Sequence, residues 1–257
     1  MRSRFSLMFI ATGLTALAGN TAAAEAWDVN IPSFGTQSMT AQLDVTEGTW
    51  LNIDVSPDGK SVLFDLLGDI YQIPIEGGDA VDLTSGLAWD MQAQYSPDGR
   101  RIAFTSDRAG GDNIWTLDLE SGVMHQVTHE SFRLLNSPTW SPDGRYIAAR
   151  KHFTTSRSLG TGEVWLYDST GNDSIAGQRI VARPGEAFQK EQGEPAFAPD
   201  GSAIYFVRNV SPGNTFIYHE DSNTELFQIS RVDLASTEIT TVAGGPGGAV
   251  RPTPSPD

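Results

Sequence analysis

One tetrapeptide, Ser-Pro-Asp-Gly, recurs along this chain of 257 residues, and its spacing restricts the folds that the chain can adopt. It occurs three times intact, once with alanine in place of serine, and once as far as its aspartate, at residues 56–59, 96–99, 141–144, 198–201 and 255–257. Its prolines stand at 57, 97, 142, 199 and 256, so the steps between them are 40, 45, 57 and 57. A motif that returns at such a period indicates a protein built from one recurring supersecondary unit.

Within each unit the tetrapeptide suits a tight turn between two strands, since proline presets φ, aspartate bonds nearby backbone and glycine accepts positive φ. Apolar positions accompany it at matching offsets: one residue just before it, one run after its glycine, a third run opened by an aliphatic–aromatic pair, and a weaker fourth. In the third unit these are Trp140, residues 147–149, Val164-Trp165 and residues 178–181. Such runs between Gly, Pro, Asp and Ser clusters predict strands.

Four antiparallel strands in each unit of about 40 to 60 residues predict the blade of a β-propeller. We therefore expect an all-β protein, with four blades of four antiparallel strands and a fifth blade begun at residues 251–255. The alternative, a β-sandwich, is not expected to repeat its strand spacing in register.

The predicted ring is incomplete, because the fifth blade lacks its remaining strands. Residues 39–45 resemble the closing strand of a blade whose partner is missing. We expect these residues and the open side of the fourth blade to expose unpaired backbone and apolar surface. A closed ring of four blades is the alternative.

The order of tetrapeptide, strand and then Gly68-Asp69-Ile70-Tyr71 or Asp112-Asn113-Ile114-Trp115 resembles the WD-like propeller repeats of TolB. Similar repeats occur in tricorn protease and in the propeller of prolyl oligopeptidase-type peptidases. The resemblance covers nearly all of residues 47–257. It implies a TolB-like β-propeller domain over residues 25–257.

A few short stretches are similar to one kind of protein within that group. Residues 47–50, 64–71 and 149–153 resemble exported bacterial proteins that fuse such a propeller to a C-terminal amidohydrolase barrel, and residues 245–252 are similar in outline. The resemblance implies the non-catalytic propeller portion of an exported hydrolase, which gates substrate or supports the barrel. A metal, zinc, would belong to that barrel, so we expect no cofactor in this chain.

Two other functions remain open. The chain could be a TolB-like periplasmic protein-interaction module without chemistry, or the propeller of a prolyl oligopeptidase-type or tricorn-like peptidase. The expected partner is accordingly either its own C-terminal catalytic domain or a periplasmic protein.

Residues 1–24 have the pattern of a signal peptide. Arg2 and Arg4 precede an apolar stretch from Phe5 to about Gly19, and small residues follow up to Ala24. We expect cleavage near Ala24 and a periplasmic or secreted protein. The apolar stretch is too short and interrupted for a membrane span, although a retained anchor is the alternative. The absence of cysteine permits an oxidising compartment without requiring one.

The formal charge is −15, and it becomes −17 when Arg2 and Arg4 leave with residues 1–24. Such acidity argues against a nucleic-acid partner, because phosphates need a footprint of Lys and Arg.

The connection between the second and third apolar runs becomes longer from the first unit to the fourth. It joins Phe64 to Ile70, Phe104 to Ile114, Ala149 to Val164 and Phe206 to Leu226, so its steps are 6, 10, 15 and 20. These connections share one face because the blades are built alike, and insertions on one face often mark the binding face.

The two longest of these connections are basic and aromatic. They hold the residues that we predict to contact a partner domain or an anionic ligand: Arg150, Lys151, His152, Arg157, Arg208, Tyr218 and His219. Alternatively, they are solvated loops whose bases balance neighbouring acids.

Catalytic patterns are weak. His125 and His129 are four residues apart but fall in and just past a predicted strand, which does not favour a zinc pair. Asp107 and Asp112 bracket a turn, whereas calcium needs about six or more oxygen ligands. No Gly-x-Ser-x-Gly elbow occurs. We assign no catalytic residue and no metal site in this chain.

Overall fold

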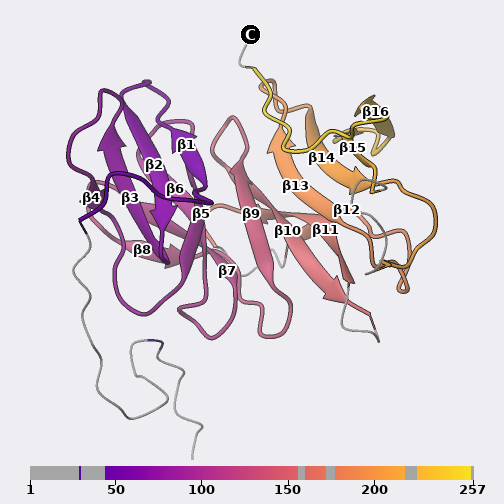
Figure 1. The fold of residues 1–257 in the computed structure, drawn as a ribbon, viewed down its shortest axis with the longest axis horizontal. Helices are drawn as coiled ribbons and strands as arrows, with labels where there is room; N and C mark the ends of the chain where they lie inside the picture. The colour runs from indigo at the N-terminus through magenta and orange to yellow at the C-terminus, as the bar shows by residue number, and fades with distance from the viewer. Residues whose placement is uncertain (1–28, 30–43, 156–159, 172–176, 218–224, 256–257) are drawn as a thin grey trace, which may run out of the picture.

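The computed structural model describes residue 29 and residues 44–155, 160–171, 177–217 and 225–255. These residues form four sheets, each of four antiparallel strands, and none of them lies in a helix. Figure 1 shows the sheets fanned in sequence order, from indigo for the first to orange and yellow for the fourth. The prediction of an all-β propeller with four-stranded blades is confirmed.

Each blade runs in chain order from an inner edge strand to an outer one. The first blade holds β1 (Ile53–Val55), β2 (Ser61–Leu66), β3 (Asp69–Pro74) and β4 (Val81–Asp82). The second holds β5 (Asp90–Tyr95), β6 (Arg101–Ser106), β7 (Asn113–Asp118) and β8 (Met124–Gln126). The third holds β9 (Leu135–Trp140), β10 (Tyr146–Thr154), β11 (Gly160–Asp168) and β12 (Gln178–Val181). The fourth holds β13 (Gln192–Phe197), β14 (Ala203–Asn209), β15 (Phe227–Asp233) and β16 (Ile239–Ala243).

A separate apolar core fills each of the three spaces between consecutive blades. The aromatic residue before the second, third and fourth tetrapeptide belongs to these cores, as Tyr95, Trp140 and Phe197, and each is less than a tenth exposed. Burying one such ring contributes about 1.5–3 kcal/mol, so the cores supply the main force that stacks the blades. In the first blade the matching residue, Val55, is 49% exposed and neighbouring Ile53 is 68% exposed.

The tetrapeptides form the turns between the first and second strands of each blade, and consecutive turns lie against one another. A Cβ added to Gly99 would lie 3.6 Å from Cδ of Pro57, and one added to Gly201 would lie 3.8 Å from Cδ of Pro142. All four glycines have φ between 69° and 71°, which a residue with a side chain rarely adopts.

The first three turns each contain the same set of hydrogen bonds. In the second turn, Ser96 Oγ donates to Asp98 Oδ1 at 2.6 Å and accepts the N–H of Arg101 at 2.9 Å. The bond from Ser96 holds the pKa of Asp98 below its usual value, with help from the N–H of Arg100. The fourth turn has the same backbone bonds, but Ala198 provides no hydroxyl.

The chain continues past the fourth blade without forming a strand at residues 249–255. Two backbone N–H groups anchor it there: that of Ala249 donates to Phe227 O at 2.9 Å, and that of Arg251 donates to Glu194 Oε2 at 3.2 Å. Of residues 39–45, only 44 and 45 are described, and Val45 is 56% exposed.

We predict that Ala198→Ser stabilises the protein, because it supplies the hydroxyl of the other three turns at a position only 5% exposed. One added network of this kind should raise the free energy of unfolding by about 1 kcal/mol, and Ser96→Ala should lower it by a similar amount. Chemical denaturation measures both. Ala235→Ser, at an exposed position, is the matched control and should change little. A neutral or destabilising Ala198→Ser would contradict the role given to the serine.

Candidate functional site

A local irregularity recurs at a fixed place, four residues before the second, third, fourth and fifth tetrapeptides. The residues there are Gln92, Ser137, Glu194 and Arg251, and all four have positive φ, between 50° and 57°. The strand ladders shift register beside the first three of them. A β-bulge turns one backbone N–H out of the ladder, and it is over-represented at the rims of barrels and next to active sites.

Side chains of the preceding blade bind the N–H groups that the bulges release. Gln92 N–H donates to Asp65 Oδ2 at 2.8 Å, and Ser137 N–H donates to Gln92 Oε1 at 2.7 Å. Arg251 N–H donates to Glu194 Oε2 in the same manner. Hydrogen bonds at the bulges therefore link the first blade to the second, the second to the third, and the fourth to the chain that follows it.

These bulges surround a polar pocket on the propeller axis, which we call the axial pocket. Its cavity volume is about 320 Å³. Five segments line it, one from each inner strand or its approach and one from the chain after the fourth blade: residues 51–53, 92–94, 137–138, 194–195 and 251–253. Its side chains include three neutral amides, one carboxylate and one guanidinium, from Asn52, Gln92, Gln94, Glu194 and Arg251.

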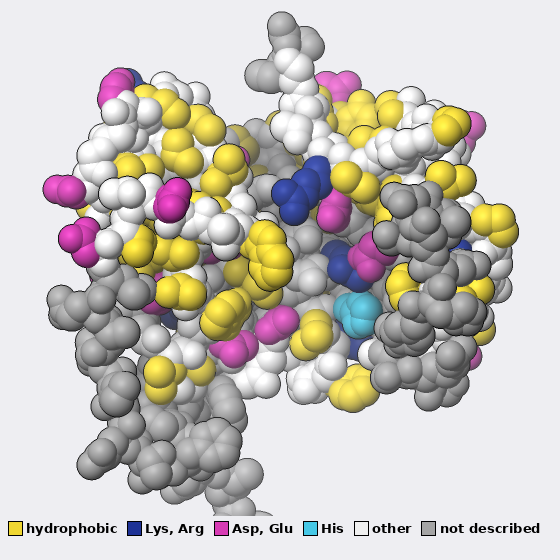
Figure 2. Space-filling model, viewed as in Figure 1, with side chains coloured by type: hydrophobic (Ala, Val, Ile, Leu, Met, Phe, Trp, Pro, Cys, Tyr) yellow, Lys and Arg dark blue, Asp and Glu magenta, His cyan; other side chains and the backbone are white. Residues whose placement is uncertain are grey.

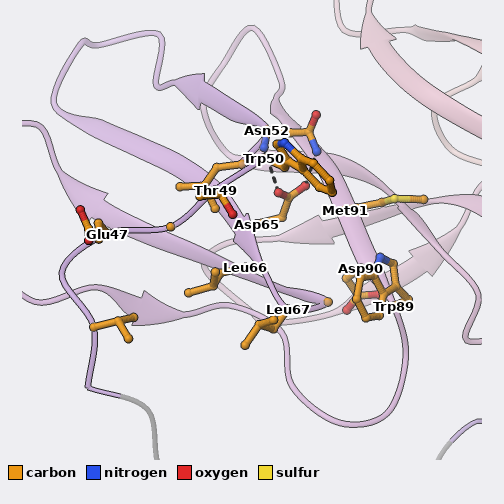
Figure 3. Close-up of a pocket in the computed structure, with 14 residues that line it drawn as sticks. Glu47, Thr49, Trp50, Asn52, Asp65, Leu66, Leu67, Trp89, Asp90 and Met91 are labelled. Carbon is orange, nitrogen blue, oxygen red and sulfur yellow. Dashed lines mark hydrogen bonds between the residues drawn. The ribbon is translucent and has the colours of Figure 1, made fainter.

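A larger pocket adjoins the axial pocket on the first blade, and we call it the first-blade pocket. Its volume is about 800 Å³, and Leu51 and Asn52 line both pockets. Figure 3 shows the side chains of Trp50, Asp65 and Met91 near one another, with Trp89 and Asp90 below Met91 and Glu47 at the far end. Asp65 connects the two pockets, because it lines this one and accepts hydrogen bonds from Asn52 and Gln92 of the other.

The predicted basic residues lie mostly in strands and not in loops. Arg150, Lys151 and His152 belong to β10, and Arg208 belongs to β14, because these two strands extend further than their counterparts in the first two blades. Their placement in the connections was therefore wrong. The other predicted residues, Arg157, Tyr218 and His219, lie outside the described residues.

Arg150 occupies a niche formed by two glycines. A Cβ on Gly193 would lie 2.5 Å from Arg150 Cδ, and one on Gly162 would lie 2.6 Å from its Nε. Nη2 of Arg150 pairs with Glu191 Oε1 at 2.6 Å and lies 3.3 Å from Nδ1 of His152. Burial, followed by the charges of Arg150 and Arg133, lowers the pKa of His152, so its ring is neutral at neutral pH.

Arg208 and Lys151 are likewise held by neighbours. Nε of Arg208 donates to Gln192 Oε1 at 2.8 Å, which brings Arg208 to the same end of β13 as Arg150. Lys151 points to the other face of β10, where it pairs with Glu130 and lies 4.5 Å from the centre of the Trp165 ring. The structure therefore brings Arg150, His152 and Arg208 together and separates Lys151 from them.

The described residues contain no group of three or more His, Asp or Glu side chains placed to hold a metal ion. Within the same part of the chain there is no helix long and apolar enough to cross a membrane. The arrangement of these residues is suited to binding by hydrogen bonds and charge, through the bulged inner strands.

The axial residues were missed at the level of sequence, although a signal for them exists. Each lies at a constant offset from the tetrapeptide, and in the last three repeats proline follows it directly, as Pro138, Pro195 and Pro252. Proline restricts the preceding residue and is confined to edge strands and bulges. The offset and the proline together mark the bulge.

The stacked four-stranded blades, with inner strands around an axial pocket, define a repeat-type β-propeller. The TolB beta propeller domain model matches residues 29–170, more than half of the sequence, and the chain belongs to this family.

Relatives agree with that assignment. The chain is 36% identical over 167 residues to an uncharacterized protein of Agrobacterium fabrum, a match that covers 60% of this chain and 53% of that protein. It is 28% identical over 169 residues to the Tol-Pal system protein TolB of Wolinella succinogenes, covering 64% of this chain and 38% of that one. An uncharacterized peptidase of Bacillus subtilis is 25% identical over 56% of this chain and 25% of its own length. The chain thus spans about half or less of the length of these curated relatives.

Solved structures support the fold. TolB from Acinetobacter baumannii superposes with a TM-score of 0.58 at 23% identity, over 80% of this chain and 46% of that one. A structure from Agrobacterium tumefaciens assigned to TolB gives a TM-score of 0.60 at 23% identity, over 80% of this chain and 66% of that one.

We predict that Arg150→Ala destabilises the protein by about 1–3 kcal/mol, because the side chain is only 15% exposed and its loss empties the niche and leaves Glu191 unpaired. Thermal or urea unfolding measures the change. Lys60→Ala is the control, since Lys60 is 79% exposed and pairs only with surface Asp58. If Arg150→Ala were as stable as the parent, Arg150 would be free to act as a docking residue and the structural role would be wrong.

Proposed function

We propose that this chain is the non-catalytic propeller of an exported protein and that it binds a segment of a partner protein at the axial pocket. The positive-φ positions around the axial pocket carry the proposal: the bulges at Gln92, Ser137 and Glu194, and Arg251 in the chain after the fourth blade. Non-glycine residues at positive φ cost about 1 kcal/mol or more each, and they persist where the surrounding structure holds them, often at binding sites. Here they sit at one offset in successive repeats and face one cavity.

The lining of the axial pocket suits a polypeptide ligand. Its amides can both donate and accept hydrogen bonds, which matches the N–H and C=O groups of an extended chain. Glu194 and Arg251 add one charge of each sign, so the pocket does not select strongly for one ionic ligand. At about 320 Å³ it accommodates one side chain or a short turn of a partner.

Export is part of the proposal. It is supported by the signal-peptide pattern of residues 1–24, which lie outside the described residues, and by the similarity to TolB of the Tol-Pal system. A periplasmic or secreted interaction module is the function that these features favour.

A second candidate is the propeller of a peptidase, which screens access to a catalytic domain. The peptidase of Bacillus subtilis and a tricorn-like protease subunit of Sulfurisphaera tokodaii match this chain over only 25% and 21% of their own lengths, as expected if they share one propeller. An amidohydrolase barrel, which the short stretches in the sequence suggested, has no counterpart among the relatives described above. It stays a weaker prediction than the peptidase.

The basic residues of the third and fourth blades remain candidates for the contact with a partner domain. Arg150 and Arg208 contact Glu191 and Gln192 at the start of β13, three and two residues before the bulge at Glu194. A partner seated on the axis would therefore reach this end of the strand. Their ion pairs and hydrogen bonds make them supports of that surface as well.

Site-specific photocrosslinking tests the proposal. A photoreactive phenylalanine analogue replaces Thr253, an exposed residue of the axial pocket, in the full chain expressed with its leader. We expect a discrete adduct with a cellular protein, and several-fold less of it when Glu194→Gln removes the charge on the pocket wall. The matched control carries the analogue at Glu120, an exposed residue of the β7–β8 turn outside both pockets.

Equal adducts at positions 253 and 120, or none at 253, would contradict axial binding. Hydrolysis of peptide or amide substrates by the purified chain would contradict the non-catalytic part of the proposal.

A further inference from the structure

Large apolar side chains of the first-blade pocket are exposed to solvent. Trp50 is 99% exposed, Leu67 is 67% exposed and Trp89 is 55% exposed, and all three line this pocket. Figure 2 shows hydrophobic side chains gathered on the side of the first blade. Contiguous exposed apolar surface of this kind marks an interaction site more often than chance scatter. Trp50 also has φ of 58°, and burial of its side chain does not offset that strain because the side chain is almost fully exposed.

The charge of this pocket has one sign. Glu47, Asp65 and Asp90 line it, and no Lys or Arg among the described residues does. Asp65 is 8% exposed and accepts three hydrogen bonds from neutral donors: Asn52 N–H at 2.9 Å, the Asn52 amide at 2.7 Å and Gln92 N–H at 2.8 Å. Among the described bases, none forms an ion pair with it.

Asp90 adds a second carboxylate, of which only one oxygen has a partner. It is fully buried, and Oδ2 pairs with Nη2 of Arg108 at 2.6 Å, whereas Oδ1 has no hydrogen-bond partner. A buried carboxylate oxygen without a partner is uncommon in folded proteins, and a donor supplied by a ligand would satisfy it. The wall that carries Asp90 also carries Trp89.

Indole faces lie here beside Asp65, which forms no ion pair with a described base, and beside Asp90, which keeps one oxygen without a partner. A guanidinium or ammonium is attracted to the face of tryptophan and to a carboxylate together, and its alkyl stem packs on apolar surface. We propose that the first-blade pocket binds a basic side chain, Arg or Lys, flanked by apolar residues, from a polypeptide partner. This site goes beyond the axial pocket of the proposed function, and its test uses no residue of the bulges.

The probe is the tripeptide amide acetyl-Leu-Arg-Leu, and its control is the same peptide with citrulline, which keeps the shape of arginine without its charge. Titration of the full chain by calorimetry or tryptophan fluorescence should show binding of the arginine peptide, weakened by salt. Citrulline should weaken binding about three- to thirtyfold, the range of a desolvated cation–π contact.

Protein variants make the test specific. Trp50→Ala should weaken the arginine peptide by a similar factor, and Trp50→Phe should retain most of the affinity. Because Trp50 is almost fully exposed, its replacement leaves the fold intact, which unfolding curves verify. Phe132→Ala is the matched control, since Phe132 is 75% exposed and lies outside the pocket.

Three results would overturn the proposal: no binding at millimolar peptide, equal binding of the citrulline peptide, or a Trp50→Ala variant that binds as well as the parent. Self-association of the chain that Trp50→Ala abolishes, without peptide binding, would show that the patch is a contact between copies and would overturn it as well.

Discussion

From the second repeat onward, the structure depends on a fixed distance between two backbone irregularities, the tetrapeptide turn and the positive-φ residue four residues before it. The turn is held by serine, aspartate and glycine together, and neighbouring turns lie in contact, so the end of every inner strand is set against the one before it. Once the turn fixes the end of the inner strand, strand geometry determines which backbone position faces the propeller axis. Each bulge then costs backbone strain, and at Gln92 and Ser137 a hydrogen bond to the preceding blade offsets about 0.5–1.5 kcal/mol of it.

In this arrangement the turns and cores stay constant between repeats, and the residue at the bulge varies. The turns and the cores between blades are nearly the same in each repeat, whereas the bulged residue changes from Gln92 to Ser137, Glu194 and Arg251. The same frame therefore presents an uncharged amide, a hydroxyl, an acid and a base on one cavity. Binding chemistry can differ between members of such a family without a change in the fold, which is why the family assignment alone does not define the ligand.

The fold could be predicted from sequence because its determinants are local and repeat. Strand positions followed from the tetrapeptide and from runs such as residues 147–149 and Val164-Trp165. The site could not be predicted in the same way. Arg150 and His152 are adjacent to a long connection, but hydrogen bonds between neighbouring strands decide that they lie in β10. Trp50 and Asp65 meet in one pocket only after the first blade has folded, and no local pattern shows that.

The central claim is that the bulges of the second and third blades are coupled through Gln92 and Ser137, and amide hydrogen exchange at Ser137 tests it most directly. Its N–H donates to the side chain of Gln92 in the blade before. Gln92→Leu should speed exchange at Ser137 about two- to tenfold, whereas Gln92→Glu, which keeps an acceptor, should not. The amide of Tyr95, bonded to Asp54, is the internal control. Exchange at Ser137 that is the same in Gln92→Leu as in the parent would contradict the coupling on which the axial pocket rests.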